Sequence, residues 1–196
     1  MLDLYDIIIN AFKIMFGAEE YYFTIVLTSL YVSVTATIVA SLIFIPLSAL
    51  IVVNNFFLKK FLQVVINSLL ALPPVVIGLF LYILFSRIGV FGDLDLLYTS
   101  SIMIIAQVIL IIPIIMTLAI NNINNIYYKY REYLISIHSD KISTMLTIIW
   151  ESRRDIVVGT LVAFGRVLSE VGAIIIVGGN IENLTRTMTT GIVLET

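Results

Sequence analysis

Four long apolar runs alternate with charged and polar segments along this chain. The runs cover residues 21–53, 61–86, 98–120 and 156–179. A membrane hydrocarbon core of ~30 Å requires roughly 20 residues of helix, so each run predicts one membrane-spanning helix. Because a backbone in lipid must satisfy its own hydrogen bonds, we expect an all-α polytopic membrane protein, with one domain over residues 1–196 and about four spans.

The segment before the first run predicts a short interfacial helix. Residues 1–19 contain an apolar stretch about half as long as a span, bounded by acidic residues. Asp3 and Asp6 stand where a cleavable signal peptide carries positive charge. We therefore expect no cleaved leader here.

The loop 121–155, between the third and fourth runs, predicts two short amphipathic helices. Apolar residues recur at helical spacing over 132–150, and His138-Ser139-Asp140 interrupts them with a turn. Asp140 or Ser139 can cap the second helix. Such a pair would either dock on another protein or lie on the lipid surface, and the spacing alone leaves both interpretations open.

The distribution of Lys and Arg predicts the orientation in the membrane. The loops between spans one and two and between spans three and four contain Lys59, Lys60, Lys129, Arg131, Lys141, Arg153 and Arg154. The opposite side has only Lys13, Arg87 and Arg186. The positive-inside rule then places the N-terminus outside and the 121–155 loop in the cytoplasm. With four spans, we expect the C-terminus outside as well.

The composition places the chain in a membrane and excludes several chemistries. It is 60% hydrophobic and 12% charged with a mean hydropathy of +1.09, whereas soluble domains are about 25% charged. With no cysteine and one histidine, the chain has no disulfide, thiol nucleophile or His-cluster metal site. It contains no Walker-type phosphate loop. We expect no catalytic residue, metal or cofactor bound by this chain, so active transport would draw its energy from elsewhere.

All four prolines lie within or at the end of an apolar run. The strongest case is Leu72-Pro73-Pro74-Val75, because a double proline removes backbone hydrogen bonds and clashes with the preceding turn. The sequence predicts either a kink that helps packing or a broken helix that lines a substrate path, and it does not decide between them.

Arg166 and Glu170 are the only charged residues within the fourth run. A charge at the centre of a spanning helix costs about 2.5–3.5 kcal/mol, so the pair requires a partner, a cavity or a substrate route. Their spacing of four allows an ion pair. Gly165, Ser169 and Ala173 form a neighbouring stripe of small residues, which predicts a close helix–helix contact. The pair is either a bridge that fixes packing or a gate in a pathway.

These segments resemble those of a known family, the permease subunits of ABC importers for tungstate. Residues 163–196 are similar to the corresponding segment of these permeases, and the related molybdate and sulfate permeases carry an Arg-x-x-Gly-Glu-x-Gly-Ala/Ser pattern followed by a Gly-Asn pair. The matching positions here are Arg166, Ser169, Glu170, Gly172, Ala173 and Gly179-Asn180. Residues 67–79 resemble the second-span motif, and Ala106-Gln107 with Pro113 fits the third span. Ser169 and Met188-Thr189-Thr190 favour tungstate.

The resemblance implies a permease subunit in the inner membrane of a prokaryote. Its partners would be a second copy of itself, a cytoplasmic ABC ATPase dimer that binds ATP and Mg²⁺, an extracytoplasmic oxyanion-binding protein and the lipid bilayer. The chain would not be an enzyme and would bind no nucleic acid. The cargo would be tungstate, with molybdate or another small anion as the alternative.

The resemblance also implies roles for two groups of residues. The ATPase-docking loop would contain Glu132, Leu134, Ile137, His138, Ser139, Asp140 and Met145. The pathway, its gate or its packing would involve Pro73, Pro74, Arg166, Ser169, Glu170 and Gly172.

The chain departs from the family pattern in two places. In the cytoplasmic signature, Tyr133 and Leu134 replace two alanines, His138 replaces a glycine, and Trp150 stands where a proline is usual. Relatives also continue into a fifth span after the position of Thr196. A membrane scaffold or assembly protein that does not transport is therefore the alternative from a different functional class.

Overall fold

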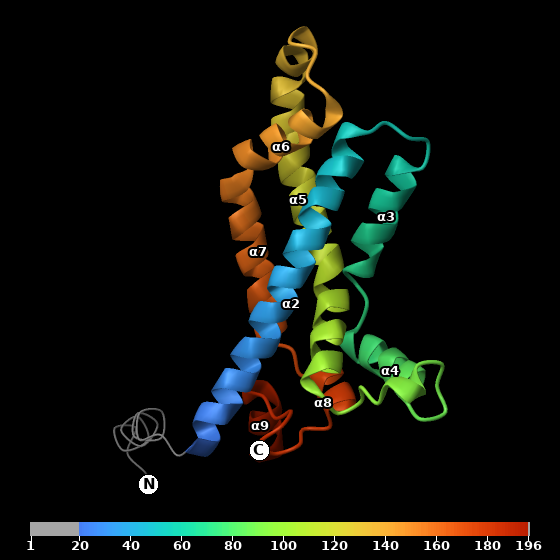
Figure 1. The fold of residues 1–196 in the computed structure, drawn as a ribbon, viewed down its shortest axis with the longest axis vertical. Helices are drawn as coiled ribbons and strands as arrows, with labels where there is room; N and C mark the ends of the chain where they lie inside the picture. The colour runs from blue at the N-terminus through green and yellow to red at the C-terminus, as the bar shows by residue number, and fades with distance from the viewer. Residues whose placement is uncertain (1–19, 196) are drawn as a thin grey trace.

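The computed structural model describes residues 20–195, with side chains from 21 to 194, and over this range the fold is all-α. Eight α-helices and one short 3₁₀-helix follow one another within this range, and the longest of them stand roughly upright in Figure 1. The all-α class expected of a polytopic membrane protein is thereby confirmed. The interfacial helix predicted for residues 1–19 lies outside the described residues.

Helices α2, Glu20–Val53, and α5, Ser100–Ser136, form the central pair of the fold. Both continue through a proline, Pro46 and Pro113 respectively, without a break. At ~1.5 Å per residue, each is longer than a ~30 Å hydrocarbon core. The polar segment predicted at 121–155 therefore begins inside a helix, because α5 extends well beyond its predicted span.

The second predicted span, 61–86, is two helices in the structure. α3 is Lys59–Leu69 and α4 is Pro74–Phe85, and the two are bent by 97°. α3 stands beside α5, whereas α4 lies across the lower end of the molecule in Figure 1. The double proline thus produces a broken helix and not a kink. A 3₁₀-helix, η1, Gly92–Leu94, lies in the connection from α4 to α5.

The chain after α5 forms four shorter helices. These are α6, Lys141–Glu151; α7, Arg153–Leu168; α8, Gly172–Gly178; and α9, Met188–Glu195. The fourth predicted span, 156–179, is also interrupted, because α7 and α8 are bent by 58°. Of the predicted amphipathic pair at 132–150, the first member is the end of α5 and the second is α6.

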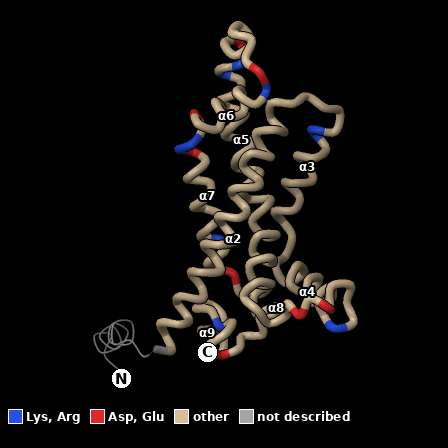
Figure 2. The backbone as a smooth tube through the Cα atoms, viewed as in Figure 1, with Lys and Arg blue, Asp and Glu red and all other residues tan. Residues whose placement is uncertain are grey.

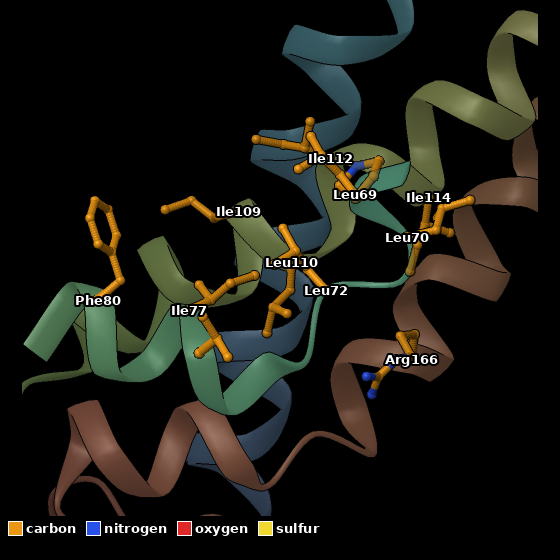
Figure 3. Close-up of a pocket in the computed structure, with 12 residues that line it drawn as sticks. Leu69, Leu70, Leu72, Ile77, Phe80, Ile109, Leu110, Ile112, Ile114 and Arg166 are labelled. Carbon is orange, nitrogen blue, oxygen red and sulfur yellow. The ribbon is translucent and has the colours of Figure 1, made fainter. Parts of the chain in front are cut away.

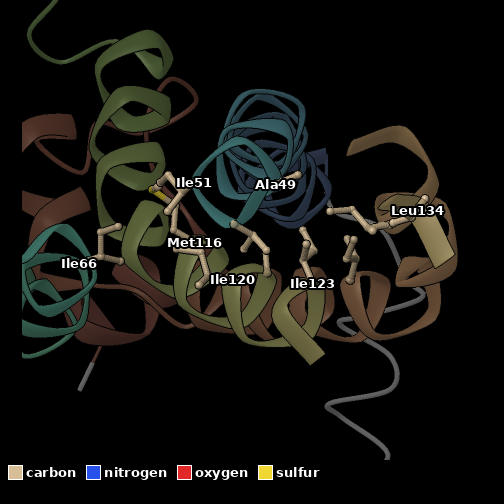
Figure 4. Packing of buried hydrophobic residues seen from close by; sticks show 11 residues of the cluster. Ala49, Ile51, Ile66, Met116, Ile120, Ile123 and Leu134 are labelled. Atoms are coloured by element: carbon tan, nitrogen blue, oxygen red, sulfur yellow. The ribbon is translucent and has the colours of Figure 1, made fainter. Parts of the chain in front are cut away.

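Buried apolar side chains hold α2, α3, α5 and α6 together at one end of the molecule. Figure 4 shows this cluster, in which Ile51 of α2, Ile66 of α3 and Ile123 of α5 are 5%, 4% and 0% exposed. A second cluster around Met103 joins α5 to α8, and a third around Ile111 joins α5 to α7. Within lipid such contacts stabilise by close packing, since lipid tails are as apolar as the side chains.

The distribution of charge and of exposed apolar residues is that of a membrane protein. α2 and α5 are long and apolar enough to cross a membrane, and the number of spans rises to four if each bent pair counts as one. Charged residues gather toward the two ends of the molecule (Figure 2). Between them the outer surface is largely apolar, with Leu42 71% and Phe80 60% exposed. Lipid accepts such a surface, whereas water does not.

Candidate functional site

The double proline makes the first of two helix breaks at the centre of the candidate site. Pro73 has an extended backbone (φ −64°, ψ 129°), and Pro74 begins α4. Proline lacks the N–H that would continue α3, and it disfavours the helical conformation for the residue before it. α3 therefore ends at Leu69, and Pro74 stands at the one helical position where its missing N–H costs little.

The second break, between α7 and α8, contains no proline and is held by Glu170. Oε1 of Glu170 accepts the backbone N–H of Ala173 at 3.3 Å, and the Glu170 N–H donates to the Val167 carbonyl at 3.1 Å. The carboxylate thus satisfies an amide in the first turn of α8 that has no partner inside its own helix. Glu170 connects the end of one helix to the start of the next.

Arg166 and Glu170 form the ion pair that their spacing allows. Nη1 of Arg166 lies 2.7 Å from Oε2 of Glu170, and the Glu170 side chain is 6% exposed whereas that of Arg166 is 44% exposed. One carboxylate oxygen therefore caps α8 while the other pairs with Arg166. The ion pair therefore lies at the break between α7 and α8. Part of the Arg166 guanidinium remains exposed.

The predicted stripe of small residues is not a helix–helix contact within this chain. A Cβ on Gly165 would meet nothing within 4 Å. Gly165 and Ser169 are exposed, whereas Ala173 is buried beyond the break. The three residues do not share one helix face, because the helix that would align them ends at Leu168.

The close contact occurs instead between α4 and α8. A Cβ on Gly78 would lie 2.8 Å from Cα of Ala173, and a Cβ on Gly172 would lie 2.7 Å from Cγ2 of Val75. Real Cβ atoms do not approach other atoms this closely, so both positions require glycine. The double-proline motif and the charged motif, far apart in the sequence, are therefore one packed unit.

The C-terminal segment closes this unit on its outer side. The Thr189 hydroxyl donates to the Glu170 carbonyl at 2.8 Å, and the Met188 N–H donates to the Ser29 hydroxyl of α2 at 2.7 Å. These bonds attach α9 to both the second break and α2. The Met-Thr-Thr sequence thus has a structural role that its position in the sequence does not reveal.

The Gly179-Asn180 pair forms the turn after α8. Both residues have positive φ, 71° and 50°, and a Cβ on Gly179 would lie 2.6 Å from Cδ1 of Tyr98. The Tyr98 N–H also donates to the Val177 carbonyl at 2.9 Å. Only glycine fits at position 179, and asparagine tolerates the left-handed conformation that follows.

An apolar pocket of about 390 Å³ opens beside the first break (Figure 3). α3, α4 and α5 contribute leucine and isoleucine side chains such as Leu69, Ile77 and Ile109, and Arg166 is the only charged residue of the lining. Apolar walls cannot replace the water around an anion. The lining of this pocket, apolar with one cation at its edge, is therefore not suited to binding an anion.

Where α5 ends and α6 begins, the structure separates the residues predicted for docking. Glu132, Ile137, His138 and Asp140 are exposed, and Ser139 is half-buried. Leu134 (5% exposed) belongs to the buried cluster of Figure 4, and the half-buried Met145 packs against that cluster. The helical phase of α5 and α6 turns these two side chains inward.

An apolar stripe on α6 is exposed in their place. Ile142, Leu146 and Trp150, spaced by four, are 69%, 63% and 65% exposed. The Arg153 guanidinium carbon lies 4.5 Å from the Trp150 ring centroid, and Nη1 donates to the Trp150 carbonyl at 2.7 Å. These three residues were not among those predicted for docking, although their spacing of four is visible in the sequence.

The turn before α6 has the predicted cap. Oδ2 of Asp140 accepts the N–H groups of Ile142 and Ser143 at 3.2 and 3.3 Å. Hydrogen bonds from the Ser143 hydroxyl and these amides hold the pKa of the Asp140 carboxyl below its usual value. His138 has φ 50°, in the left-handed region where glycine is favoured. Within the described residues, no group of three His, Cys, Asp or Glu side chains is placed to hold a metal.

Comparison with known proteins finds relatives among transport permeases, although no family model matches the chain. A tungstate uptake system permease protein, TupB, of Peptoclostridium acidaminophilum is 35% identical over 184 residues, which cover 94% of this chain and 81% of that protein. The TupB protein of Campylobacter jejuni is 41% identical over 130 residues, 66% of this chain and 54% of that protein. A Haloferax volcanii protein named "Probable anion ABC transporter permease protein" is 35% identical over 128 residues, 63% of this chain. The matches span about half the length of the last two relatives, 54% and 55%.

Proposed function

We infer that this chain, which belongs to the permease family of the TupB proteins, is the membrane-spanning subunit of an ATP-driven importer that carries tungstate into the cell. The observation that supports this most directly is the match to a tungstate uptake permease across 94% of the chain. The paired helix breaks add support, because irregular backbone at membrane depth is tolerated only where it is packed against protein or lines a cavity.

The paired breaks, with Pro73-Pro74 in one and Glu170 in the other, would line the pathway. Arg166 would provide a positive charge there for a passing dianion, although Glu170 at 2.7 Å cancels much of its field. The apolar pocket beside Arg166 would resist passage of a hydrated ion until the conformation changes. The breaks would therefore act as a gate and not as a high-affinity binding site.

The partners follow from the same proposal. The turn at His138-Ser139-Asp140 and the exposed stripe of α6 would dock on a cytoplasmic ATPase dimer, which would bind ATP and Mg²⁺. A second copy of the chain would complete the pathway, and an extracytoplasmic binding protein would deliver the oxyanion. The membrane would be the inner membrane of a prokaryote, with the 121–155 segment on the cytoplasmic side.

Molybdate is a second cargo to consider, because one relative is named only as an anion permease. Both anions are tetrahedral, doubly charged oxyanions, so the helix breaks would not distinguish them by charge. In an importer of this kind the binding protein would set the selectivity.

Reconstitution in proteoliposomes with the ATPase and the binding protein tests the function. We expect ATP-dependent uptake of tungstate that exceeds the uptake of molybdate and sulfate. If molybdate were taken up faster than tungstate, the proposed cargo would be wrong and the proposed permease function would stand. An intact complex that takes up none of the three anions would contradict transport and favour the scaffold alternative.

A further inference from the structure

A small polar pocket lies between α3 and α5, on the cytoplasmic side of the first break. Its volume is about 100 Å³, well below the ~300–1,000 Å³ of pockets that hold drug-sized molecules. Its polar lining consists of uncharged side chains, namely Gln63, Asn67, Thr117, Asn121 and Asn124. We call it the amide pocket. Ile66 and Ile120, both 4% exposed and labelled in Figure 4, form its apolar wall.

One hydrogen bond fixes the Asn67 side chain so that its N–H groups are available as donors. The Thr117 hydroxyl donates to Oδ1 of Asn67 at 2.9 Å, which leaves the Asn67 NH₂ group free to donate to a ligand. The side chains of Gln63, Asn121 and Asn124 make no hydrogen bond to any described residue. Each amide carries two N–H donors, so four side chains can offer donors to one small acceptor.

These amide side chains would be unfavourable if they faced lipid. Asn67 and Asn121 are exposed in the single chain, and Gln63 and Asn124 are half-buried. Unpaired amides are costly in hydrocarbon, so this face requires water, a ligand or another chain. The neighbouring apolar residues of α3 and α5 keep the polar face narrow.

The chemistry of the pocket suits a small anion that binds and leaves. The pocket contains no carboxylate that would repel an anion, and no Lys or Arg that would hold a dianion tightly. Permeation requires sites weak enough to release their ion, and uncharged N–H donors meet that requirement. Lys60, exposed and one turn before Gln63 on α3, adds positive potential on the cytoplasmic side.

The position along α3 also suits release into the cytoplasm. Asn67 is followed by Leu69 and Leu70, which line the apolar pocket beside Arg166. An ion that passed the apolar pocket would meet the amide pocket within about one helical turn, ~5 Å. The order from outside to inside is thus one cation, an apolar barrier and a cluster of neutral donors.

We propose that the amide pocket is a transient binding site for the transported oxyanion on its way into the cytoplasm. The proposal rests on the function inferred above. It adds a place where the anion binds, whereas the paired breaks would act only as a gate. The site takes a small tetrahedral oxyanion through neutral N–H and O–H donors, and it faces water when the transporter is open inward.

The absence of cysteine from the chain allows a direct test. Asn121→Cys and Gln63→Cys each place one thiol in the pocket, and Phe57→Cys is the control, since Phe57 is 100% exposed on the same side. The assembled transporter, with its ATPase and without nucleotide, is placed in inside-out vesicles. The rate of modification by an anionic methanethiosulfonate reagent is measured in sodium tungstate and in sodium chloride of equal ionic strength.

We expect both pocket thiols to react, and tungstate to slow them by about threefold at a concentration about twice the dissociation constant. The Phe57→Cys rate should not change. Adding Asn67→Leu should raise the tungstate concentration needed for protection, an effect that a purely structural Asn67 would not produce. Equal rates in tungstate and chloride would overturn the proposal. So would two unreactive thiols, because a second copy or lipid would then cover the pocket.

Uptake by the unmodified transporter, measured in parallel, separates this proposal from the proposed function. Tungstate uptake without protection would refute the amide pocket alone. Protection without uptake of any oxyanion would refute the importer and leave the binding site standing.

Discussion

At the scale of single residues, Glu170 makes three contacts, two of which depend on its carboxylate and would be lost on substitution. Its carboxylate caps α8 and pairs with Arg166, and its carbonyl accepts a bond from Thr189. Its side chain is 6% exposed and that of Arg166 is 44% exposed. The carboxylate therefore depends on its partner more than the guanidinium does.

This difference predicts an asymmetric response to mutation. Arg166→Gln leaves a buried carboxylate without its counter-charge, a change that typically costs about 3–5 kcal/mol, whereas Glu170→Gln leaves a half-exposed Arg and should cost less. Thermal unfolding of the purified complex in detergent measures both. The double variant should recover part of the loss. Equal losses from the two single variants would contradict the asymmetry.

Asp140 predicts a pH dependence at the start of α6. Because its pKa is lowered in the folded protein, the cap stabilises fully above the unfolded value of about 3.9 and is lost as the pH falls through the folded pKa. The protection factors of the first-turn amides of α6, which correct for the intrinsic exchange rate, should therefore fall as the pH drops below about 3.9. In Asp140→Asn, which retains an acceptor oxygen but does not titrate, this fall should disappear.

At the scale of helices, the contact of α4 with α8 depends on two glycines. Gly78→Ala and Gly172→Ala place a methyl group within 2.8 Å and 2.7 Å of existing atoms. We expect each to lower stability by about 1–3 kcal/mol, the usual cost of overpacking, and to reduce uptake. Gly165→Ala is the matched control, because its methyl group meets open space. It should be neutral or stabilise α7 by up to about 1 kcal/mol.

The exposed stripe of α6 predicts the loss of a partner. Trp150→Ala removes its largest side chain, and we expect the affinity for the ATPase to fall about tenfold, as for an aromatic residue central to an interface. Thr147→Ala, exposed on the same helix but off the stripe, is the control. Co-purification at a series of ATPase concentrations measures the difference. An unchanged affinity in Trp150→Ala would show that the stripe lies on lipid.

At the scale of the whole molecule, the charge pattern predicts which end faces the cytoplasm. Phe57 and Ile88 are 100% and 99% exposed, in the connections at opposite ends of α3 and α4. In right-side-out vesicles, a thiol reagent that does not cross membranes should label Ile88→Cys and not Phe57→Cys. The reverse pattern would invert the proposed orientation.

The sequence predicted the apolar segments well, because hydropathy depends only on local composition. α2 matches its predicted span almost residue for residue, and the cap at Asp140 was visible from local chemistry. The break at Glu170 was not, since it contains no proline and Gly172 after it could equally have stood inside a continuous helix. Nor could the sequence show that Gly78 and Ala173 meet, because that contact joins residues 95 positions apart. The amide pocket escaped notice for the same reason: its residues come from two helices.

The packing of α4 on α8 has a mechanical consequence. Because the glycine contacts leave no room for α4 and α8 to slide past each other, a rotation of one about its break would carry the other with it. α4 is 12 residues long, or ~18 Å, so a rotation of about 10° would move its far end by about 3 Å. Such a rotation would leave α6 in place.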